Sequence, residues 1–577
     1  MPDVKETKAQ RAERLKRSKN AWEHFDEIRE FARRGFDSIP PEWFSTYFRP
    51  WGLYTQGDGR GVLGGSNGEG KAVPFFMVRI RVPNGLLTSE QVRAIAALSA
   101  ERGNGVADIT VRQNFQLHWI AIESIPEVLE RIWAIGLTTT GACGDVTRTT
   151  TGCPLAGVHA HELADVSRLA VHLDEDLAGN PDFYNLPRKY KISLTACPDW
   201  CSYPEINDVG LTATLRRRST GSGPLESDDT SAELGFSIRV GGGLSTHPHL
   251  GVRLNAFIPP QQVIPVVRAV TETFRDSQVL RQSREKARLK FLFLEHGWNA
   301  ESFLAAIESR LGYRLDPAEP EQLPAHIHRD HLGVIPQKQP GLFTVGASVL
   351  RGRISPEQLR AVADLADRYA DGHVRNTTMQ NLLLVNVPEA DVPPVVSELN
   401  GVGLPVQSSA FIRGTVACTG SEFCKLALTE TKSFARWLAE ELEERFPNYQ
   451  EDLRLHITGC PNSCGQHWIA DIGIEGKKIK SDGKMIDAYY FCVGGSVGQV
   501  ASIARPIGYR CAAEEVPEAI ARLLTFFHAE RHSGEALQNF LARQTTPTLR
   551  NVLAGGVTGV AERDLPVSAV PHSVEDR

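Results

Sequence analysis

Four cysteines in the second half of the 577-residue chain combine a residue type and a spacing that bind metal. They lie in the runs ACTGSEFC and GCPNSC and are Cys418, Cys424, Cys460 and Cys464. Four thiolates are the ligand set of a [4Fe–4S] cube or of a structural zinc ion. Zinc sites typically separate the members of a pair by about two to four residues, whereas the first pair here is separated by five. The spacing favours the cluster, with zinc or unrelated buried thiols as alternatives.

The chain contains an internal repeat, which sets its organisation. SEQVRAIAAL from Ser89 matches PEQLRAVADL from Pro356, at an offset of 267. LTACPDWCSYPEINDVG from Leu194 matches ITGCPNSCGQHWIADIG from Ile457, at an offset of 263. Chance similarity does not keep nearly one offset over separate motifs. The sequence therefore predicts two copies of one ancestral unit.

Each copy is expected to begin with an α+β unit. In the first copy, an apolar strand at 75–82 precedes an amphipathic helix, and a second strand is predicted at 109–122. The second copy repeats this order, with strands predicted at 342–349 and 377–387. A larger segment with Gly-rich turns (VGGGLS, VGGSVG) follows in each copy. The predicted fold class is α+β (α/β), built twice.

The two copies differ in their cysteines. The first keeps Cys153, Cys197 and Cys201 in register with three of the four cysteines above, but His159 stands where Cys424 would align. The first copy therefore either holds a second metal or is a relic that packs its thiols. Because duplicated halves commonly specialise, we favour the relic and expect the cluster in the second copy and the substrate chemistry in the first.

Polar side chains in the first copy form a second group of interest. If the run ITVRQNFQLHWI is a strand, alternation places four polar residues on one face, namely Arg112, Asn114, Gln116 and His118. An arginine on such a face inside an apolar protein requires an anion or a carboxylate. An ordinary solvent-facing strand is the alternative.

Further cations cluster in the same copy. Lys189 and Lys191 lie two residues apart in NLPRKYKISL, so their ammonium groups leave the same face and repel each other unless an anion lies between them. Arg148 stands among small residues in GDVTRTTTGCPLAG, and KARLKFL adds Arg288 and Lys290. Any one of these is most often a surface charge. Together they indicate a site for a strongly negative ligand.

With these motifs in this order, the chain resembles the sirohaem-dependent sulfite and nitrite reductases. The resemblance covers about residues 40–530 and rests on the C-x5-C and C-x3-C cysteines, TVRQNFQLH, the Arg148 segment, LPRKYK and the duplication. Members of that family hold a [4Fe–4S] cluster coupled to sirohaem. The resemblance therefore implies these two cofactors and argues against zinc at the four cysteines of the second copy.

The resemblance implies an internally duplicated nitrite/sulfite reductase fold. Its two pseudo-twofold-related halves would each hold a ferredoxin-like half-domain and a larger α/β domain for sirohaem and cluster. The expected segments are an N-terminal helical and extended segment (1–65), the first half-domain (66–135), a sirohaem and substrate domain (136–300), a linker (301–335), the second half-domain (336–405), a [4Fe–4S] and sirohaem domain (406–535) and a C-terminal tail (536–577), disordered at its end.

The resemblance also implies roles for single residues. By motif position Cys464 is a cluster ligand and the axial ligand of the haem iron, and Cys418, Cys424 and Cys460 complete the cube. Sirohaem carries eight carboxylates, which would account for the inward cations. The residues expected to contact the substrate anion are Arg112, Arg148, Lys189 and Lys191. Further cofactor-binding residues are expected to be Gln116, His118, Lys290, Arg413 and Asn462.

The expected reaction is the six-electron reduction of sulfite to sulfide. Plant- and cyanobacterial-type nitrite reductases typically have asparagine at the position of Lys191, and a second lysine suits sulfite, which is largely dianionic near neutral pH. Tyr54 and Cys143 resemble a pair near the haem of sulfite-reducing members, where the two can become covalently joined. The alternative is reduction of nitrite to ammonia at the same site, because the cysteine runs look equally like those of nitrite reductases.

Composition limits the partners. A net charge of -6 gives no indication of nucleic-acid binding, and no stretch of eighteen apolar residues indicates a membrane span. The charged N-terminal run lacks the apolar region of a secretory signal, so we expect a cytoplasmic protein. Without a Gly-rich dinucleotide fingerprint, a separate donor is expected, most simply ferredoxin, and the family resemblance suggests a monomer. A related cobalamin-pathway oxygenase or a plain iron–sulfur carrier would not need the four cations.

Overall fold

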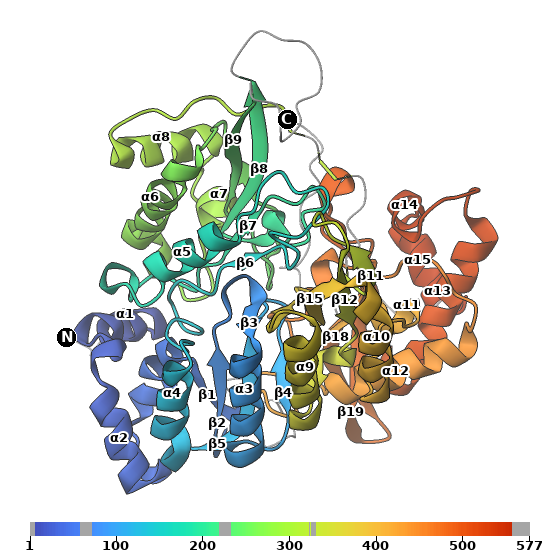
Figure 1. Cartoon of the computed structure of the whole chain (residues 1–577), viewed down its shortest axis with the longest axis horizontal. Helices are drawn as coiled ribbons and strands as arrows, with labels where there is room; N and C mark the ends of the chain where they lie inside the picture. Colours follow the sequence, from blue (N-terminus) through green and yellow to red (C-terminus); the bar gives the residue numbers. More distant parts are fainter. Residues whose placement is uncertain (1–5, 58–71, 218–231, 322, 325–329, 557–577) are drawn as a thin grey trace.

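The computed structural model describes residues 6–57, 72–217, 232–321, 323–324 and 330–556. Within them the strands form four five-stranded sheets, with helices packed around them (Figure 1). In this part of the chain, no helix is both long and apolar enough to cross a membrane. Two of the sheets belong to the α+β units and two to the larger segments that follow, so the sequence repeat is a repeat of architecture.

The first α+β unit builds a sheet with the order β1-β2-β5-β4-β13. These strands are β1 (Leu53–Gly57), β2 (Ala72–Ile80), β5 (Phe115–Ala121), β4 (Ala107–Ile109) and β13 (Arg353–Ile354). Its helices are α1 (Lys8–Ser18), α2 (Phe25–Arg34), α3 (Ser89–Arg102) and α4 (Ile125–Ala134). Helix α3 begins at a capping box in which the Thr88 hydroxyl accepts a hydrogen bond from the Gln91 N–H. The helix predicted from the repeat is therefore confirmed.

The second α+β unit has the same plan, with the order β11-β12-β15-β14-β3. These strands are β11 (Gly333–Pro336), β12 (Leu342–Ala347), β15 (Leu382–Pro388), β14 (His373–Asn376) and β3 (Leu86–Thr88). Its helices are α9 (Pro356–Tyr369) and α10 (Val392–Gly401). Helix α9 begins at the matching capping box, formed by Ser355 and Gln358. The repeat thus extends to the local signal that starts each helix.

The two α+β units are joined by an exchange of strands. Strand β13 of the second copy completes the sheet of the first, and β3 of the first copy completes the sheet of the second. Helices α3 and α9 lie side by side (Figure 1), and their side chains Ile95 and Val362 belong to one hydrophobic core. Arg93 forms an ion pair with Asp364 at 2.7 Å across the same contact. The two units therefore share a core rather than meeting as separate domains.

The larger segments build the other two sheets, each with three parallel strands followed by antiparallel ones. The first contains β6 (Thr151–Gly152), β7 (Ile192–Thr195), β8 (Val209–Arg217), β9 (Ala232–Val240) and β10 (Val252–Arg253), with α5 (Ser167–Leu177), α6 (Val263–Asp276), α7 (Phe291–Glu295) and α8 (Ala300–Leu311). The second contains β16 (Thr415–Ala417), β17 (Leu455–Thr458), β18 (Ile472–Ser481), β19 (Lys484–Val493) and β20 (Arg505–Ala512), with α11 (Ala410–Arg413), α12 (Lys432–Arg445), α13 (Val516–Glu530), α14 (Leu537–Arg543) and α15 (Thr546–Leu553).

The second strand predicted in each α+β unit is too long at its start. Residues 110–114 form a turn before β5, closed by a hydrogen bond from the Thr110 N–H to the Asn114 carbonyl at 2.9 Å. The same turn precedes β15, and Gln113 and Gln380 hold matching left-handed conformations, with φ of 61° and 64°. Arg112 is therefore in a turn, not on the strand face that alternation predicted. Apolar and polar residues alternate through this turn as they do along a strand, and this alternation led to the strand prediction.

The two turns also lock the copies together. The Gln113 amide donates a hydrogen bond to the Asn376 carbonyl at 3.0 Å, and the Gln380 amide donates one to the Ile109 carbonyl at 2.9 Å. Ile109 and Asn376 are themselves equivalent at the offset of 267. Each turn thus donates a hydrogen bond to the carbonyl at the end of a strand in the other copy. This contact gives the repeated Gln-Asn pair a physical cause.

The segment boundaries stay predictions, although several elements cross them. Strand β1 lies in the expected N-terminal segment but pairs with β2, and β11 begins in the expected linker but pairs with β12. Helices α14 and α15 lie in the expected tail, and their Leu541 and Leu549 are buried in the core of the second large segment. The end of the tail expected to be disordered lies outside the described residues.

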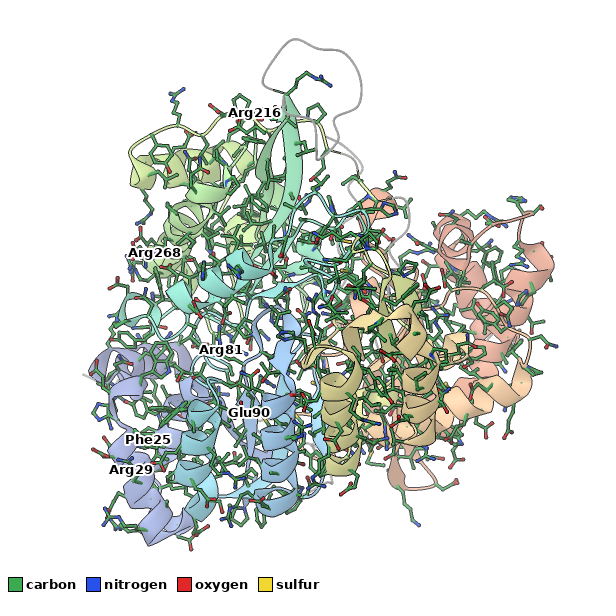
Figure 2. The ribbon with its side chains drawn as sticks, viewed as in Figure 1. Phe25, Arg29, Arg81, Glu90, Arg216 and Arg268 are labelled. Atoms are coloured by element: carbon green, nitrogen blue, oxygen red, sulfur yellow. The ribbon has the colours of Figure 1, made fainter. Side chains whose placement is uncertain are left out.

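A buried ion pair fastens the first α+β unit to the segment that follows it. Arg81, which follows β2 and is 0% exposed, pairs with Asp174 of α5 at 2.6 Å. The Arg81 guanidinium also donates to the Thr147 carbonyl, and Asp174 accepts from the Thr150 N–H. In Figure 2 Arg81 lies inside the molecule, whereas Arg268 lies at its edge. Removing one member leaves the other charge buried and unpaired.

We therefore expect Asp174→Ala to lower the free energy of unfolding by about 3–5 kcal/mol, read as a fall of the thermal midpoint. Asp176→Ala is the matched control, because its pair with Arg268 is partly exposed and such pairs contribute about 1 kcal/mol or less. Equal shifts for the two variants would contradict the account of the buried pair.

Candidate functional site at the junction of the two copies

The four cysteines of the second copy lie on two loops that follow neighbouring parallel strands. Cys418 follows β16, and Cys460 and Cys464 follow β17, which pairs with β16 in parallel. Because the ends of parallel neighbours lie at one edge of a sheet, the two loops meet there. The Cys418 N–H donates to the Ile457 carbonyl at 3.1 Å, which holds the loops together.

The sulfur atoms of Cys418 and Cys460 receive hydrogen bonds from the end of β17 and the loop that follows it. The Gly459 N–H donates to Cys418 Sγ at 3.2 Å, and the Thr458 hydroxyl donates to the same sulfur at 3.9 Å. The Asn462 amide donates to Cys460 Sγ at 3.5 Å. Donors aimed at sulfur stabilise thiolates and tune the potential of a cluster. Asn462, predicted to bind cofactor, lies among these donors.

Two glycines let the backbone approach closely around these cysteines. A Cβ on Gly465 would lie 2.2 Å from the Ile457 carbonyl oxygen, and a Cβ on Gly420 would lie 2.4 Å from the Thr431 hydroxyl. Gly420 also has φ of +68°, which disfavours other residues. No larger residue fits either position without moving a cysteine loop.

The other three cysteines are electrostatically coupled to Cys464. Burial raises the pKa of Cys424 to about 12 and also raises those of Cys418 and Cys460, and a Cys464 thiolate raises all three further. A single tetrahedral zinc ion holds its sulfurs about 3.8 Å apart, given zinc–sulfur bonds of about 2.3 Å. Among the described residues, no three of these four sulfurs lie within 4.8 Å of one another. The wider spacing suits a cube rather than one ion.

The cations of the first copy meet at the start of β7. Arg112 donates to the Thr149 and Ile192 carbonyls at 2.5 and 3.0 Å, and Arg148 donates to the Gly144 carbonyl at 2.9 Å. Burial, and then the charge of Arg148, lower the pKa of Arg112 to about 9. Its buried Nε has no hydrogen-bond partner within the described part of the chain. The turn thus brings Arg112 to the cluster of cations by a route that strand alternation did not predict.

Lys189 and Lys191 flank Tyr190 just before β7 and are half-buried. Burial, then the charge of Arg288, lower the pKa of Lys189 to about 8, although a Cys464 thiolate raises it. Burial and the neighbouring cations lower the pKa of Lys191 well below its usual value. Within the described residues neither ammonium forms an ion pair or a hydrogen bond. The influence of Cys464 on Lys189 joins the cations of one copy to the cysteines of the other.

Lys290 and Arg413 stand in different surroundings. The Lys290 ammonium donates to the Leu244 carbonyl at 2.7 Å and to the His247 carbonyl, and burial lowers its pKa to about 6. Arg413, at the end of α11, forms an ion pair with Asp330 at 2.7 Å. Their roles as cofactor-binding residues stay predictions.

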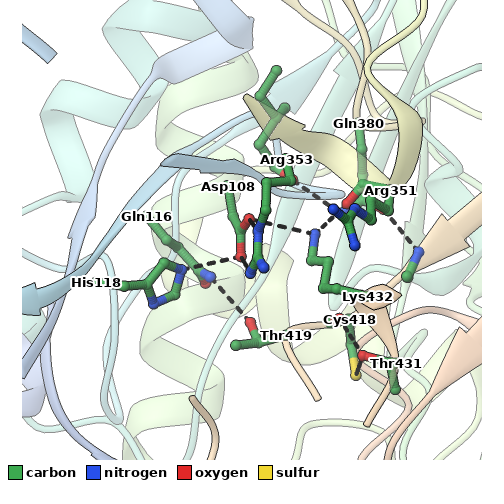
Figure 3. A network of polar contacts seen from close by, with 12 residues as sticks. Asp108, Gln116, His118, Arg351, Arg353, Gln380, Cys418, Thr419, Thr431 and Lys432 are labelled. Carbon is green, nitrogen blue, oxygen red and sulfur yellow. Dashed lines mark hydrogen bonds and ion pairs between the residues drawn. The ribbon is translucent and has the colours of Figure 1, made fainter. Parts of the chain in front are cut away.

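Gln116 and His118 of β5 reach the cysteine loop of the other copy (Figure 3). The Gln116 amide donates to the Thr419 hydroxyl at 3.2 Å, and the His118 ring stacks on Phe423 with centroids 4.2 Å apart. Thr419 and Phe423 both lie between Cys418 and Cys424. The first copy therefore covers the cluster loop of the second.

A buried charge network supports this contact (Figure 3). The Asp108 carboxylate lies 3.0 Å from His118 Nε2, 3.0 Å from Arg353 Nε and 3.8 Å from the Lys432 ammonium. Burial raises the pKa of Asp108, but these cationic partners outweigh it and hold the pKa below its usual value. Arg353 and Lys432 come from the second copy, so the network spans the junction.

Sequence reasoning missed part of this site. Arg79 of β2 donates to the side-chain amide oxygen Oε1 of Gln116 at 2.5 Å and to Cys143 Sγ at 2.9 Å. Arg79 and Arg81 stand two residues apart in the otherwise apolar run FFMVRIRV. This pattern was the sequence signal that Arg79 faces the site. Nothing in the sequence around Lys432 distinguished it from a surface lysine of an amphipathic helix.

Comparison with known proteins accounts for this arrangement. Residues 143–315 and 408–557 match the nitrite and sulphite reductase 4Fe-4S domain, and residues 69–135 and 335–402 match the nitrite/sulfite reductase ferredoxin-like half domain. The chain belongs to the nitrite and sulfite reductase family. The resemblance and the duplicated fold inferred from the sequence are thereby confirmed.

Relatives within the family carry two different names. The ferredoxin–nitrite reductase of Synechococcus elongatus is 37% identical over 531 residues, covering 90% of this chain and 96% of the relative. Sulfite reductase [ferredoxin] 2 of Mycolicibacterium paratuberculosis is 36% identical over 531 residues, covering 90% and 92%. The solved NirA structure of Mycobacterium tuberculosis superposes with a TM-score of 0.86 at 34% identity, covering 93% of this chain and 97% of that one.

The residues of the site fit the cofactors of this reductase family, a [4Fe–4S] cluster and sirohaem. Donors from Gly459 and Asn462 already point at cysteine sulfur. The ammonium groups of Lys189 and Lys191 and the buried Arg112 Nε have no partner among the described residues. Sirohaem, when bound, supplies a redox-active iron and carboxylates that need such cations.

We expect Gly465→Ala to lower the iron and acid-labile sulfide content of the purified reductase about tenfold or more, because the new methyl group displaces the loop of Cys464. Gly401→Ala is the control, since nothing lies within 4 Å of its Cβ position. Full iron content in Gly465→Ala would show that the loop adjusts and that the close approach is not required.

Proposed function

We propose that this reductase converts sulfite to sulfide, with electrons from ferredoxin. In this proposal Cys418, Cys424, Cys460 and Cys464 would hold the cluster, and Cys464 would also hold the sirohaem. Arg112, Arg148, Lys189 and Lys191 bind the substrate anion. Gln116, His118, Lys290, Arg413 and Asn462 hold the cofactors, as their motif positions imply.

The observation that carries the proposal is the pair of unpartnered ammonium groups at Lys189 and Lys191. Two half-buried lysines beside Arg112 repel one another, so the site is stabilised by a ligand with more than one negative charge. Sulfite is largely dianionic near neutral pH, whereas nitrite carries a single charge. The charge balance therefore supports sulfite over nitrite.

The side chains contribute binding and protons. Reduction of the sulfite dianion to hydrosulfide consumes six electrons and seven protons and releases three waters. Fixed cations neutralise the oxyanion and stabilise charge on its oxygens, which are poor leaving groups until they are protonated. Lys189, with a pKa of about 8, is charged at neutral pH and still acidic enough to donate a proton. Burial, then the charges of Arg112 and Lys189, lower the pKa of Lys191 well below its usual value, which makes it a stronger proton donor than a free lysine.

The proposed donor follows from the relatives, whose names specify ferredoxin. A one-electron protein donor suits a [4Fe–4S] cluster, which would supply single-electron chemistry at this site. The proposal is tested by steady-state turnover with reduced ferredoxin, comparing kcat/KM for sulfite with kcat/KM for nitrite. We expect the ratio to favour sulfite. A ratio that favours nitrite would overturn the substrate assignment and leave fold and cofactors unchanged.

We expect Lys191→Ala to lower kcat/KM for sulfite by about 10²-fold or more, because a cation that stabilises the oxyanion is removed. Its visible absorption, which reports the tetrapyrrole, should match that of the native protein. Lys480→Ala, at an exposed position, is the control and should retain activity. Loss of the absorption in Lys191→Ala would assign that lysine to the cofactor rather than to the substrate.

The pH dependence should show Lys189. Its lowered pKa means that the charged form is present below about pH 8 and is lost above it. We therefore expect kcat/KM for sulfite to fall on the alkaline side of the pH profile. The midpoint of this alkaline limb should be no lower than about pH 8, because bound anions favour the charged form. Lys189→Arg, which does not titrate in this range, should move that limb upward. An unchanged limb in this variant would assign the titration to another group.

A further inference from the structure

Three thiols of the first copy come together where its cluster would lie by symmetry. Cys153 follows β6, and Cys197 and Cys201 follow β7, as the cysteines of the second copy follow β16 and β17. The three Sγ atoms all lie within 4.8 Å of one another. Each residue is at most 3% exposed. The site is therefore preformed and closed to bulk solvent.

The spacing of this trio differs from that of the cluster cysteines. Sulfurs on one tetrahedral zinc ion lie about 3.8 Å apart, a separation that the trio meets with small adjustment. No three cluster cysteines meet the same limit of 4.8 Å. The sulfur atoms are thus farther apart in the second copy than in the first. The wider spacing suits a cube, and the narrower spacing suits a single ion.

The wall of the trio comes from the other copy and is apolar. Leu383 and Val385 of β15 pack against the three thiols, at the positions equivalent to Gln116 and His118 of β5. The same backbone that presents a polar face to the cluster loop presents two aliphatic side chains here. An apolar wall excludes water from the thiols.

A cation stands beside the trio without a carboxylate partner. Arg375 of β14 donates to the Pro154 and Ala156 carbonyls at 2.8 and 2.7 Å. Its buried Nε has no hydrogen-bond partner, and within the described residues the guanidinium forms no ion pair. Burial lowers the pKa of Arg375, and a Cys153 thiolate would raise it. The half-buried guanidinium also lies in the field of Asp165, Glu162 and Asp371, and thiolates at the trio would add to the negative charge that it balances.

A candidate fourth ligand lies beside one member of the trio, although its ligand atom is not within 4.8 Å of all three Sγ atoms and must move toward them to complete a site. His159, which replaces the fourth cluster cysteine in the repeat, and Asp199 have ligand atoms within 4.8 Å of each other and of Cys197 Sγ. The His159 Nδ1 accepts a hydrogen bond from the His161 N–H at 3.0 Å. The ring binds a metal through Nε2 once that contact is given up and Nδ1 carries the proton.

We propose that Cys153, Cys197, Cys201 and His159 form a structural zinc site, distinct from the cluster and the sirohaem. Binding converts three thiols to thiolates and releases three protons, with no change of oxidation state. A zinc ion with three thiolates and a neutral imidazole carries one negative charge, which Arg375 balances. The ion would fasten the loops of the first copy against strands β14 and β15 of the second.

The first experiment is metal analysis of the full-length protein grown with added zinc. We expect one zinc per chain in addition to cluster iron, retained through gel filtration in EDTA. X-ray absorption at the zinc edge should show three sulfurs at about 2.3 Å and one nitrogen at about 2.0–2.1 Å. This readout does not involve sirohaem and does not depend on turnover, so it is independent of the proposed sulfite chemistry.

Variants then assign the ligands. Cys201→Ser should lower zinc content about tenfold or more and leave iron unchanged, whereas Cys424→Ser should lower iron and leave zinc. Cys492→Ala removes a buried thiol outside both groups and should retain both metals. His159→Ala should make the zinc removable by EDTA, and Asp199→Ala should not.

Three results would overturn the proposal. One is native protein that holds no zinc after incubation with the ion. A second is iron and sulfide in excess of one cube, which would make the trio a cluster site. The third is a disulfide between two of the three cysteines in the protein as isolated. Because all three are measured on the native chain, they decide the question even where Cys201→Ser does not fold.

Discussion

The structure depends on the way the two copies close each other's strand ends. Gln113 and Gln380 each carry a left-handed turn and donate a side-chain amide to a carbonyl of the other copy. Unpaired carbonyls at buried strand ends are costly, so neither copy completes its own sheet alone. The exchanged strands β3 and β13 follow from the same constraint. The junction is therefore fixed in register, and the cations of one copy stand beside the cysteines of the other.

Buried charge is arranged differently on the two sides of that junction. The Asp108 carboxylate is compensated by His118, Arg353 and Lys432, and these four residues form a closed structural network. Lys189 and Lys191 have no such compensation among the described residues. Uncompensated buried cations destabilise a protein unless a ligand supplies the opposite charge. That asymmetry separates the residues that hold the scaffold from those that we propose bind anions.

The two copies share a backbone arrangement but differ in the side chains that surround their cysteine loops. Gln116 and His118 at the cluster correspond to Leu383 and Val385 at the thiol trio, and Asp108 corresponds to Arg375. Each substitution changes polarity or the sign of a charge while the strand that carries it is kept. The equivalent cysteine loops consequently meet a polar wall in one case and an apolar wall beside a cation in the other. Divergence of a few wall residues is enough to change which metal group the thiols suit.

The sequence by itself determined the repeat, the helices α3 and α9, the family and its cofactors, because these depend on motifs whose spacing is local. It misplaced Arg112 on a strand, since alternation of polarity does not distinguish a strand from a turn closed by Thr110 and Asn114. Only the tertiary structure decided that Arg79 contacts Cys143, that Lys432 is buried beside Asp108, and that three first-copy thiols converge. These contacts join segments that are distant in the sequence, within the first copy for Arg79 and the thiols and across the junction of the copies for Lys432. Packing, rather than local pattern, sets them.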